Sequence, residues 1–230
     1  MKIYKKFGAM AFIIAGLLNT FRILPILITP GVTPEQIPPH TLIDTVHISQ
    51  TTAYVLSHIM ALLATPLVII AFYSLYKEIK LSNKHIAIQA GLLGLVGLTI
   101  GQLLYSLGLI VDGFALPTFS NLYIQTATDN NSQLGAIIMS IHQLAMSLAG
   151  VGFFSLLVST GIYGYALFMG SFNKELSLTA ITIGCLAIIG YLTGALDILI
   201  AQKFELTYGL LTLMYLFFLV VGVFQLKSVN

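Results

Sequence analysis

The sequence predicts an all-α integral membrane protein, a bundle of six transmembrane helices with both termini in the cytoplasm. Three observations support this fold class: 57% of the residues are hydrophobic and only 8% are charged, six apolar runs are long enough to cross a bilayer, and the cations gather in alternate connections. A soluble domain has about 25% charged residues. With a net charge of +2, the chain also lacks the cationic surface of a nucleic-acid-binding protein.

The predicted spans are apolar runs bounded by charged or turn-forming residues. A hydrocarbon core of about 30 Å requires roughly 20 residues of helix. The runs are Phe7–Thr29, Ala53–Tyr76, Ile86–Val111, Leu134–Phe168, Leu176–Ile200 and Leu206–Leu226. The fourth run has no polar turn between its halves, so we expect one long helix that projects beyond the bilayer. No internal boundary is visible, which predicts a single transmembrane domain over residues 1–230.

The distribution of Lys and Arg predicts the orientation, because these residues are retained on the cytoplasmic side. Eight of the ten cations fall at the termini and in the second and fourth connections: Lys2, Lys5, Lys6, Lys77, Lys80, Lys84, Lys174 and Lys227. Only Lys203 falls in the opposite connections, and Arg22 lies inside a span. The first span lacks a signal-peptide cleavage pattern and is expected to be retained.

The connections Pro30–Thr52 and Asp112–Gln133 are then on the outer side, and both lack Lys and Arg. The first contains four prolines followed by Thr41–Thr52, which has helical potential and would extend the second span outward. The second mixes aromatic and polar residues, as an interfacial cap does. Loops that cover a site have this composition, but so do loops without a function, and the sequence leaves both alternatives open.

Ionisable residues inside the spans are the strongest functional signal. A charged side chain at the bilayer centre costs about 2.5 to 3.5 kcal/mol on insertion scales, so such a residue needs a partner or water. Under the predicted orientation these residues all fall in the outer half of the membrane. They are Arg22, His58, Asp112, His142 and Asp197.

Helical spacing places these residues on stripes with other polar or small residues, because residues three and four apart share a face. The stripe of the second span is His47, Thr51, Tyr54, His58, Ala61 and Thr65, and that of the third is Gly97, Gly101, Tyr105, Gly108 and Asp112. We expect the stripes to converge on an outward-facing polar pocket, with the glycines allowing close helix approach. The predicted ligand-binding residues are Arg22, His58, Tyr105, Asp112, His142 and Asp197.

Each of these features has alternative explanations. Arg22 with Asp112 or Asp197 would equally form a structural ion pair. His58 and His142 could relay protons, ligate haem, contribute to a zinc site or act as hydrogen-bonded interior residues. No spacing places two histidines on one helix turn, and the single cysteine, Cys185, excludes CxxC motifs. The sequence therefore predicts no cofactor but leaves haem or zinc open.

The leading hypothesis is a multi-pass membrane protein that binds or transports a small polar or amphiphilic ligand, in a proton-linked manner, with the lipid bilayer as its other partner. No catalytic residue is predicted. The alternative is an integral membrane enzyme or a haem- or metal-binding redox subunit that uses His58 and His142. A second alternative is a structural subunit that docks a partner in the membrane.

A family resemblance adds to this prediction. It rests on His142, Gly150, Gly152, Phe153, Phe154, Gly161 and Gly164 and on the opening stretch Phe7–Leu18. With these residues the chain resembles the uncharacterised bacterial six-helix membrane proteins of the domain-of-unknown-function 4386 family. Those proteins carry a proline just after the long fourth helix, where this chain has none in residues 171–174. The resemblance implies six spans and a bacterial inner membrane, and it implies no catalytic residue.

Overall fold

The structure, a computed structural model, describes residues 2–33, 36–37, 39–126, 131–192 and 204–228. These residues form helices and short connections and contain no strand. The helices are α1 (Lys2–Phe21), α2 (Leu24–Leu27), α3 (Leu42–Ser49), α4 (Thr52–Leu81), α5 (His85–Ile110), α6 (Leu116–Gln125), α7 (Asn131–Met169), α8 (Lys174–Leu192) and α9 (Phe204–Lys227). Six spans among the described residues are long and apolar enough to cross a membrane. The prediction of a six-span helical bundle is confirmed.

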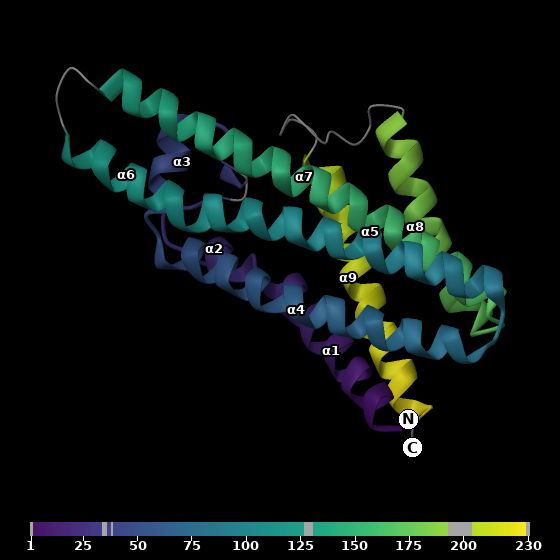
Figure 1. The fold of residues 1–230 in the computed structure, drawn as a ribbon. Coiled ribbons are helices and arrows are strands. Elements are labelled where there is room, and N and C mark those ends of the chain that lie inside the picture. The colour runs from purple at the N-terminus through teal and green to yellow at the C-terminus, as the bar shows by residue number, and fades with distance from the viewer. Residues whose placement is uncertain (1, 34–35, 38, 127–130, 193–203, 229–230) are drawn as a thin grey trace.

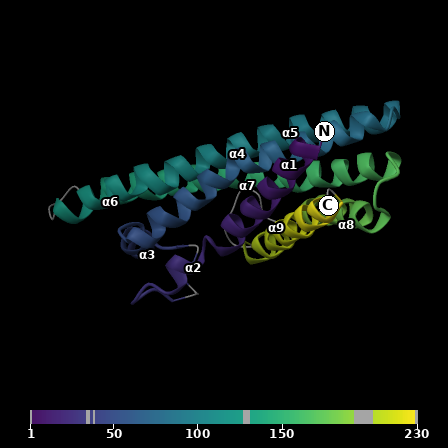
Figure 2. The same cartoon turned by 90° about the horizontal axis from the view of Figure 1, so that it is seen from below.

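The bundle is built on α5 and α7, which lie side by side over most of their length (Figures 1 and 2). Helix α4 packs on α5, and α1 packs on both α4 and α9. An aromatic core lies where α1, α4 and α9 meet, with ring centroids 5.1 Å apart for Phe12 and Phe72 and 5.2 Å apart for Phe72 and Phe218. Both pairs have edge-to-face geometry, which aromatic side chains prefer over a direct face-to-face stack.

Glycines allow α5 and α7 to approach closely, as the sequence predicts. A Cβ atom on Gly152 would lie 2.7 Å from the backbone nitrogen of Tyr105, and one on Gly101 would lie 2.9 Å from the carbonyl oxygen of Gly152. Small residues at a crossing permit this backbone contact in a membrane, where van der Waals packing drives helix association. The crossing positions the outer parts of α5 and α7 against each other.

The two chain ends meet at the same end of the bundle (Figure 1). Lys5 Nζ in α1 lies 3.2 Å from Glu78 Oε2 in α4. Gln225 Nε2 in α9 donates a hydrogen bond to Glu78 Oε1 over 3.2 Å. Both chain ends therefore lie at the same end of the bundle, as a shared side of the membrane requires. That this side is the cytoplasm remains a prediction from the cations.

The third span differs from its prediction, because the helix does not end at Val111. A π-helical turn, Val111–Ala115, leads directly into α6. Pro117 follows this turn at the start of α6, and because it has no backbone N–H it leaves one carbonyl of the preceding turn without its helical donor. Most of the predicted connection Asp112–Gln133 is therefore helix, up to Gln125.

The residues before the second span do not extend it, although the sequence predicts that they do. They form a separate helix, α3, and the spanning helix α4 begins anew at Thr52. Thr51 has an extended backbone (φ −79°, ψ 137°), and its hydroxyl accepts a hydrogen bond from the backbone N–H of Tyr54. A threonine in this geometry caps the start of a new helix. The predicted stripe is thus wrong for His47 and Thr51, which precede α4.

The predictions for the later spans agree with the described residues. Helix α7 is one unbroken helix of 39 residues. Helix α8 is described as far as Leu192, so the rest of the predicted span to Ile200, including Asp197, lies outside the described residues.

Candidate functional site

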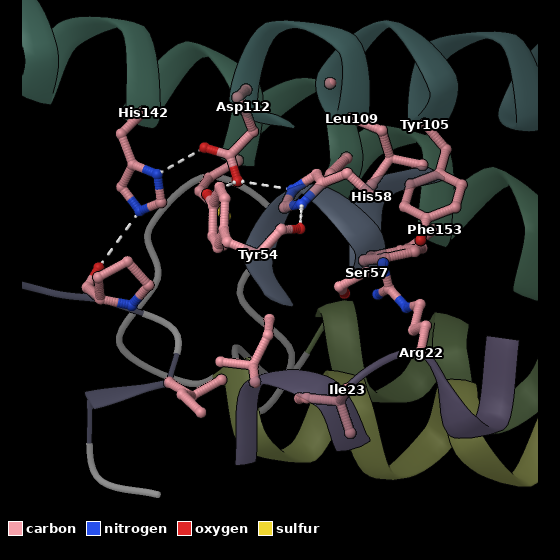
Figure 3. Close-up of a pocket in the computed structure, with 17 residues that line it drawn as sticks. Arg22, Ile23, Tyr54, Ser57, His58, Tyr105, Leu109, Asp112, His142 and Phe153 are labelled. Atoms are coloured by element: carbon pink, nitrogen blue, oxygen red, sulfur yellow. Dashed lines mark hydrogen bonds and ion pairs between the residues drawn. The ribbon is translucent and has the colours of Figure 1, made fainter. Parts of the chain in front are cut away.

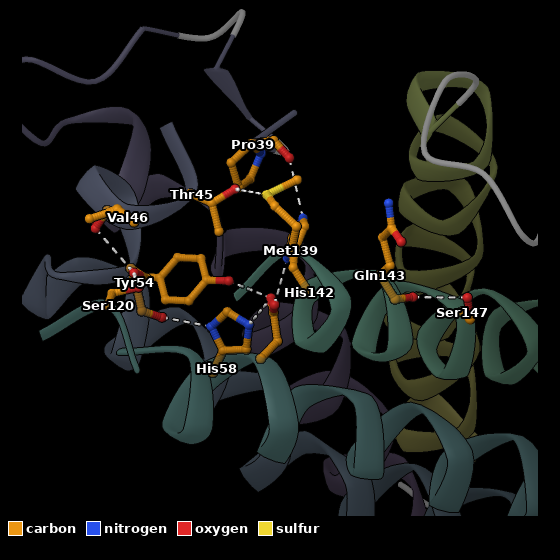
Figure 4. Close-up of polar contacts among 12 residues, drawn as sticks. Pro39, Thr45, Val46, Tyr54, His58, Ser120, Met139, His142, Gln143 and Ser147 are labelled. Carbon is orange, nitrogen blue, oxygen red and sulfur yellow. Dashed lines mark hydrogen bonds and ion pairs between the residues drawn. The ribbon is translucent and has the colours of Figure 1, made fainter. Parts of the chain in front are cut away.

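A buried carboxylate forms the centre of the candidate site, where α4, the π turn and α7 meet (Figures 3 and 4). The hydroxyl of Tyr54 donates a hydrogen bond to Asp112 Oδ2. His58 Nε2 lies 3.1 Å from the same oxygen, and His142 Nδ1 lies 2.8 Å from Asp112 Oδ1. None of the four residues is more than 9% exposed. The predicted convergence of His58, Asp112 and His142 is present in the structure.

The second nitrogen of each histidine ring also faces an oxygen. His58 Nδ1 lies 2.8 Å from the carbonyl oxygen of Tyr54, and His142 Nε2 lies 3.2 Å from the carbonyl oxygen of Pro39. A backbone carbonyl has no proton to give, so these two ring nitrogens must carry the protons. We refer to Tyr54, His58, Asp112 and His142 as the Asp112 cluster.

Local sequence explains how the cluster forms. Tyr54 and His58 are four residues apart on α4, so their side chains lie on one face, and their ring centroids are 4.3 Å apart. A Cβ atom on Gly113 would lie 2.6 Å from Cβ of His58, so α4 reaches Asp112 only because residue 113 has no side chain. The π turn holds Asp112 and Gly113 at this contact, and such turns are frequent at functional sites.

A cavity of about 70 Å³ lies beside the cluster. Five of the six predicted ligand-binding residues line it: Arg22, His58, Tyr105, Asp112 and His142. The remaining wall is largely apolar and includes Leu109, Met146 and Phe153. Drug-sized ligands occupy roughly 300 to 1,000 Å³, whereas one water needs about 10 to 15 Å³ of such space. In this conformation the cavity has room for a few waters or a small solute.

Arg22 reaches the same cavity from the end of α1. It is 7% exposed, and its guanidinium carbon lies 5.5 Å from the centroid of the Tyr105 ring, within the range of a cation–π interaction. Tyr105 in turn packs against Phe153, with centroids 4.6 Å apart. The predicted Arg22–Asp112 ion pair is corrected, because Asp112 pairs with the two histidines instead. The alternative partner, Asp197, lies outside the described residues.

The connection between α2 and α3 covers the cavity, since Ile37 and Pro39 contribute to its wall. Gln36 Nε2 donates to Asp44 Oδ1 over 2.8 Å and thereby ties this segment to α3. Asp44 lies outside the spans, and hydrogen bonds from Thr41 and Gln36 lower the pKa of its carboxyl. This connection therefore covers the cavity, whereas the connection between α5 and α7 contributes no described residue beyond Asp112 to the wall, so both alternatives for it stay open.

Two members of the site are missing from the predicted ligand-binding residues. Tyr54 lies on the predicted stripe four residues before His58, and this spacing was the available signal. Pro39 contributes only its carbonyl oxygen. Every residue carries such an oxygen, so no sequence pattern marks it.

The arrangement does not favour a metal or haem site. Among the described residues, no group of three or more His, Cys, Asp or Glu side chains could hold a metal ion. A histidine ligates iron or zinc through a nitrogen lone pair. All four ring nitrogens of His58 and His142 instead face oxygens, so ligation would require breaking one of these contacts.

Comparisons with family models, with curated proteins and with solved structures find no match to this chain. The resemblance to the domain-of-unknown-function 4386 family therefore stays a prediction.

Proposed function

We propose that this multi-pass membrane protein binds or transports a small polar or amphiphilic ligand in a proton-linked manner, with the Asp112 cluster as the proton-exchanging group. The observation that carries the proposal is the set of four contacts, each at most 3.2 Å, between histidine ring nitrogens and oxygens. The membrane is the bacterial inner membrane in this proposal, and the cluster lies in its outer half.

Counting protons gives the physical argument. Each of the four N···O contacts needs one proton to be a hydrogen bond. Two neutral imidazoles supply two of these four protons. A cluster in which all four contacts are hydrogen bonds therefore holds two more protons than one with two neutral histidines and an ionised Asp112. The net charge of the cluster is then +1 rather than −1. Every proton that leaves turns one contact into a nitrogen lone pair facing an oxygen, and a buried group without its hydrogen bond costs about 1 to 3 kcal/mol.

Ligand binding is linked to this proton count through the shared cavity. Charges interact strongly where water is largely excluded, and His58, Asp112 and His142 all line the cavity. A ligand whose affinity differs between the proton-rich and proton-poor forms shifts the equilibrium between them, and the protons change its affinity by the same factor. A small anion favours the proton-rich form, and a small cation favours the proton-poor form.

Nitrogen NMR of the purified protein tests the proposal directly. With ¹⁵N-labelled histidine, the ring-nitrogen signals report how many protons the Asp112 cluster holds, and the proposal requires this number to change between pH 5 and 8. Asp112→Asn, which keeps the side-chain shape, should alter this change. His85→Gln is the control, since His85 is exposed at the start of α5. If neither ring changes its protonation over this range, the proposal is wrong.

Reconstituted vesicles separate binding from transport. Lumenal pH is followed with a trapped indicator dye after a one-unit pH step outside, for the wild type, Asp112→Asn and His85→Gln. Flux that Asp112→Asn abolishes and His85→Gln retains supports a transporter. Proton exchange in the NMR titration without flux supports a ligand-binding protein or sensor. Equal flux in all three proteins contradicts a transport role for the cluster.

The two alternatives predict different results in the same experiments. A cluster that only ties helices together keeps its protonation unchanged over pH 5 to 8. A haem-carrying subunit shows an intense visible absorption band after purification.

A further inference from the structure

A second cavity lies at the opposite end of the bundle, beside the chain ends. It has a volume of about 380 Å³, which suits a larger ligand than the cavity at Asp112 does. Its lining combines cations, one carboxylate and apolar side chains: Tyr4, Lys5, Ser74, Lys77, Glu78, Leu81 and Phe172. An adjoining cavity of about 100 Å³ shares Lys5, Glu78 and Phe172 and extends inward to Gln225.

At this end of the bundle, the side-chain oxygen of Gln225 is a buried hydrogen-bond acceptor without a donor in the described part of the chain. Gln225 is 4% exposed, and its Oε1 atom has no hydrogen-bond donor among the described residues. Its Nε2 atom donates to Glu78, and the reverse amide orientation would place two oxygens together. A buried oxygen without a donor costs free energy, so the cavity requires a donor from a ligand or a water.

The cations of the larger cavity favour an anionic group. Lys5 pairs with Glu78 over 3.2 Å, which leaves the charge of Lys77 in excess. Lys77 is exposed, and its Nζ atom lies 5.3 Å from the centroid of the Tyr73 ring. The lining therefore has a net charge of about +1, which is carried by the ammonium group of Lys77. Lysine ammonium groups commonly bind phosphate.

The position of the cavity indicates where its ligand comes from. Tyr4 is 72% exposed and Leu81 is 59% exposed, and both lie near the ends of spanning helices. Exposed side chains at the ends of membrane-spanning helices lie at the level of the phospholipid headgroups. Basic pockets between helices at this level are sites of headgroup recognition.

We propose that these two adjoining cavities together bind a phospholipid headgroup that combines a phosphate with a hydrogen-bond donor. The phosphate lies at Lys77 and Lys5 in the larger cavity, and the donor reaches Gln225 Oε1 and Glu78 in the smaller one. Phosphatidylethanolamine offers an ammonium donor, and phosphatidylglycerol offers hydroxyl donors. Phosphatidylcholine has no N–H or O–H to donate. The site is independent of the Asp112 cluster, at the other end of α4.

Titration of the full-length purified protein with short-chain lipids tests this site. We expect the ethanolamine and glycerol lipids to bind about tenfold more tightly than the choline lipid, because only they satisfy Gln225. Lys77→Gln should weaken the binding of all three lipids by about fivefold, because one lysine near an anionic lipid surface contributes about 1 kcal/mol. Lys174→Gln, an exposed lysine outside the cavity, should leave all three unchanged. Equal binding of the three lipids, or no effect of Lys77→Gln, would overturn the proposal.

Two further measurements define the donor contact and the source of the headgroup. Gln225→Leu should remove the preference for the ethanolamine and glycerol lipids over the choline lipid, while Lys77→Gln should still weaken binding. If this preference survives Gln225→Leu, the proposed donor contact is wrong. Free phosphoethanolamine is the soluble probe. Binding at least tenfold weaker than the lipid supports a membrane source, whereas equal binding means that the site takes a soluble phosphorylated solute rather than a lipid.

Discussion

Asp44 shows how a single residue outside the membrane organises the covered site. Its Oδ2 atom accepts a hydrogen bond from the hydroxyl of Thr41 over 2.6 Å. The same hydroxyl accepts a hydrogen bond from the backbone N–H of Asp44, and this second bond caps the start of α3. Its Oδ1 atom accepts from Gln36. The segment between Gln36 and Thr41 contains Pro39, whose carbonyl oxygen meets His142. One carboxylate therefore ties down both ends of the cover.

The titration of Asp44 should reflect these contacts. We expect its pKa to lie below the ordinary value of 3.8, because Thr41 and Gln36 donate to the ionised carboxylate. The stabilisation of the cover by Asp44 is present above pH 3.8 and is lost as the pH falls through the lowered pKa. Carboxyl ¹³C NMR measures the titration, and Thr41→Val should move the pKa back toward 3.8. A titration at or above 3.8 in the wild type would contradict the contacts.

At the scale of elements, the π turn and α4 decide whether the Asp112 cluster forms. Helix α5 ends at Ile110, and the turn Val111–Ala115 inserts extra backbone before α6. Sequence spacing placed Asp112 at the end of a glycine-containing stripe. It could not reveal this turn, because π-helical turns have no characteristic amino-acid composition. The separate start of α4 at Thr51 was equally difficult to predict, since Thr41–Thr52 has helical potential throughout.

Gly113→Ala tests the contact between these elements. The new methyl group would lie 2.6 Å from Cγ of His58, so we expect a loss of about 1 to 3 kcal/mol in the free energy of unfolding, the usual cost of overpacking. Unfolding in a detergent titration measures this loss. Gly209→Ala is the matched control, since a Cβ atom there meets nothing within 4 Å. We expect that control to be neutral or slightly stabilising, because alanine favours helix. Equal stability of the two variants would show that α4 adjusts without cost.

At the scale of the whole molecule, the two polar sites lie at opposite ends of α4 and are separated by the aromatic core. Tyr54 and Glu78 are separated by 24 residues of helix, or roughly 36 Å at 1.5 Å per residue. This distance matches the thickness of a bilayer with part of its interfaces. The Asp112 cluster and the Glu78 cavity therefore face opposite sides of the membrane.

Thiol labelling in intact cells tests which side is which. After Cys185→Ser, single cysteines are introduced by Asn121→Cys in α6 and Ser228→Cys at the end of α9, both at exposed positions. A membrane-impermeant reagent should label the variant at position 121 in intact cells and the variant at position 228 only after lysis, because the cation count places the termini inside. The reverse pattern would invert the orientation and place the Asp112 cluster on the cytoplasmic side.

Hydropathy was enough to predict the six spans and the unbroken α7, because a bilayer imposes length and polarity on every helix that crosses it. Depth and helical face also identified His58, Asp112 and His142 as residues that could meet. The partners of Asp112 depended on three-dimensional contacts: the close approach at Gly113, the π turn and the carbonyl oxygen of Pro39. These contacts join segments far apart in the chain, and their energies depend on distances of a few ångströms that residue order alone does not specify.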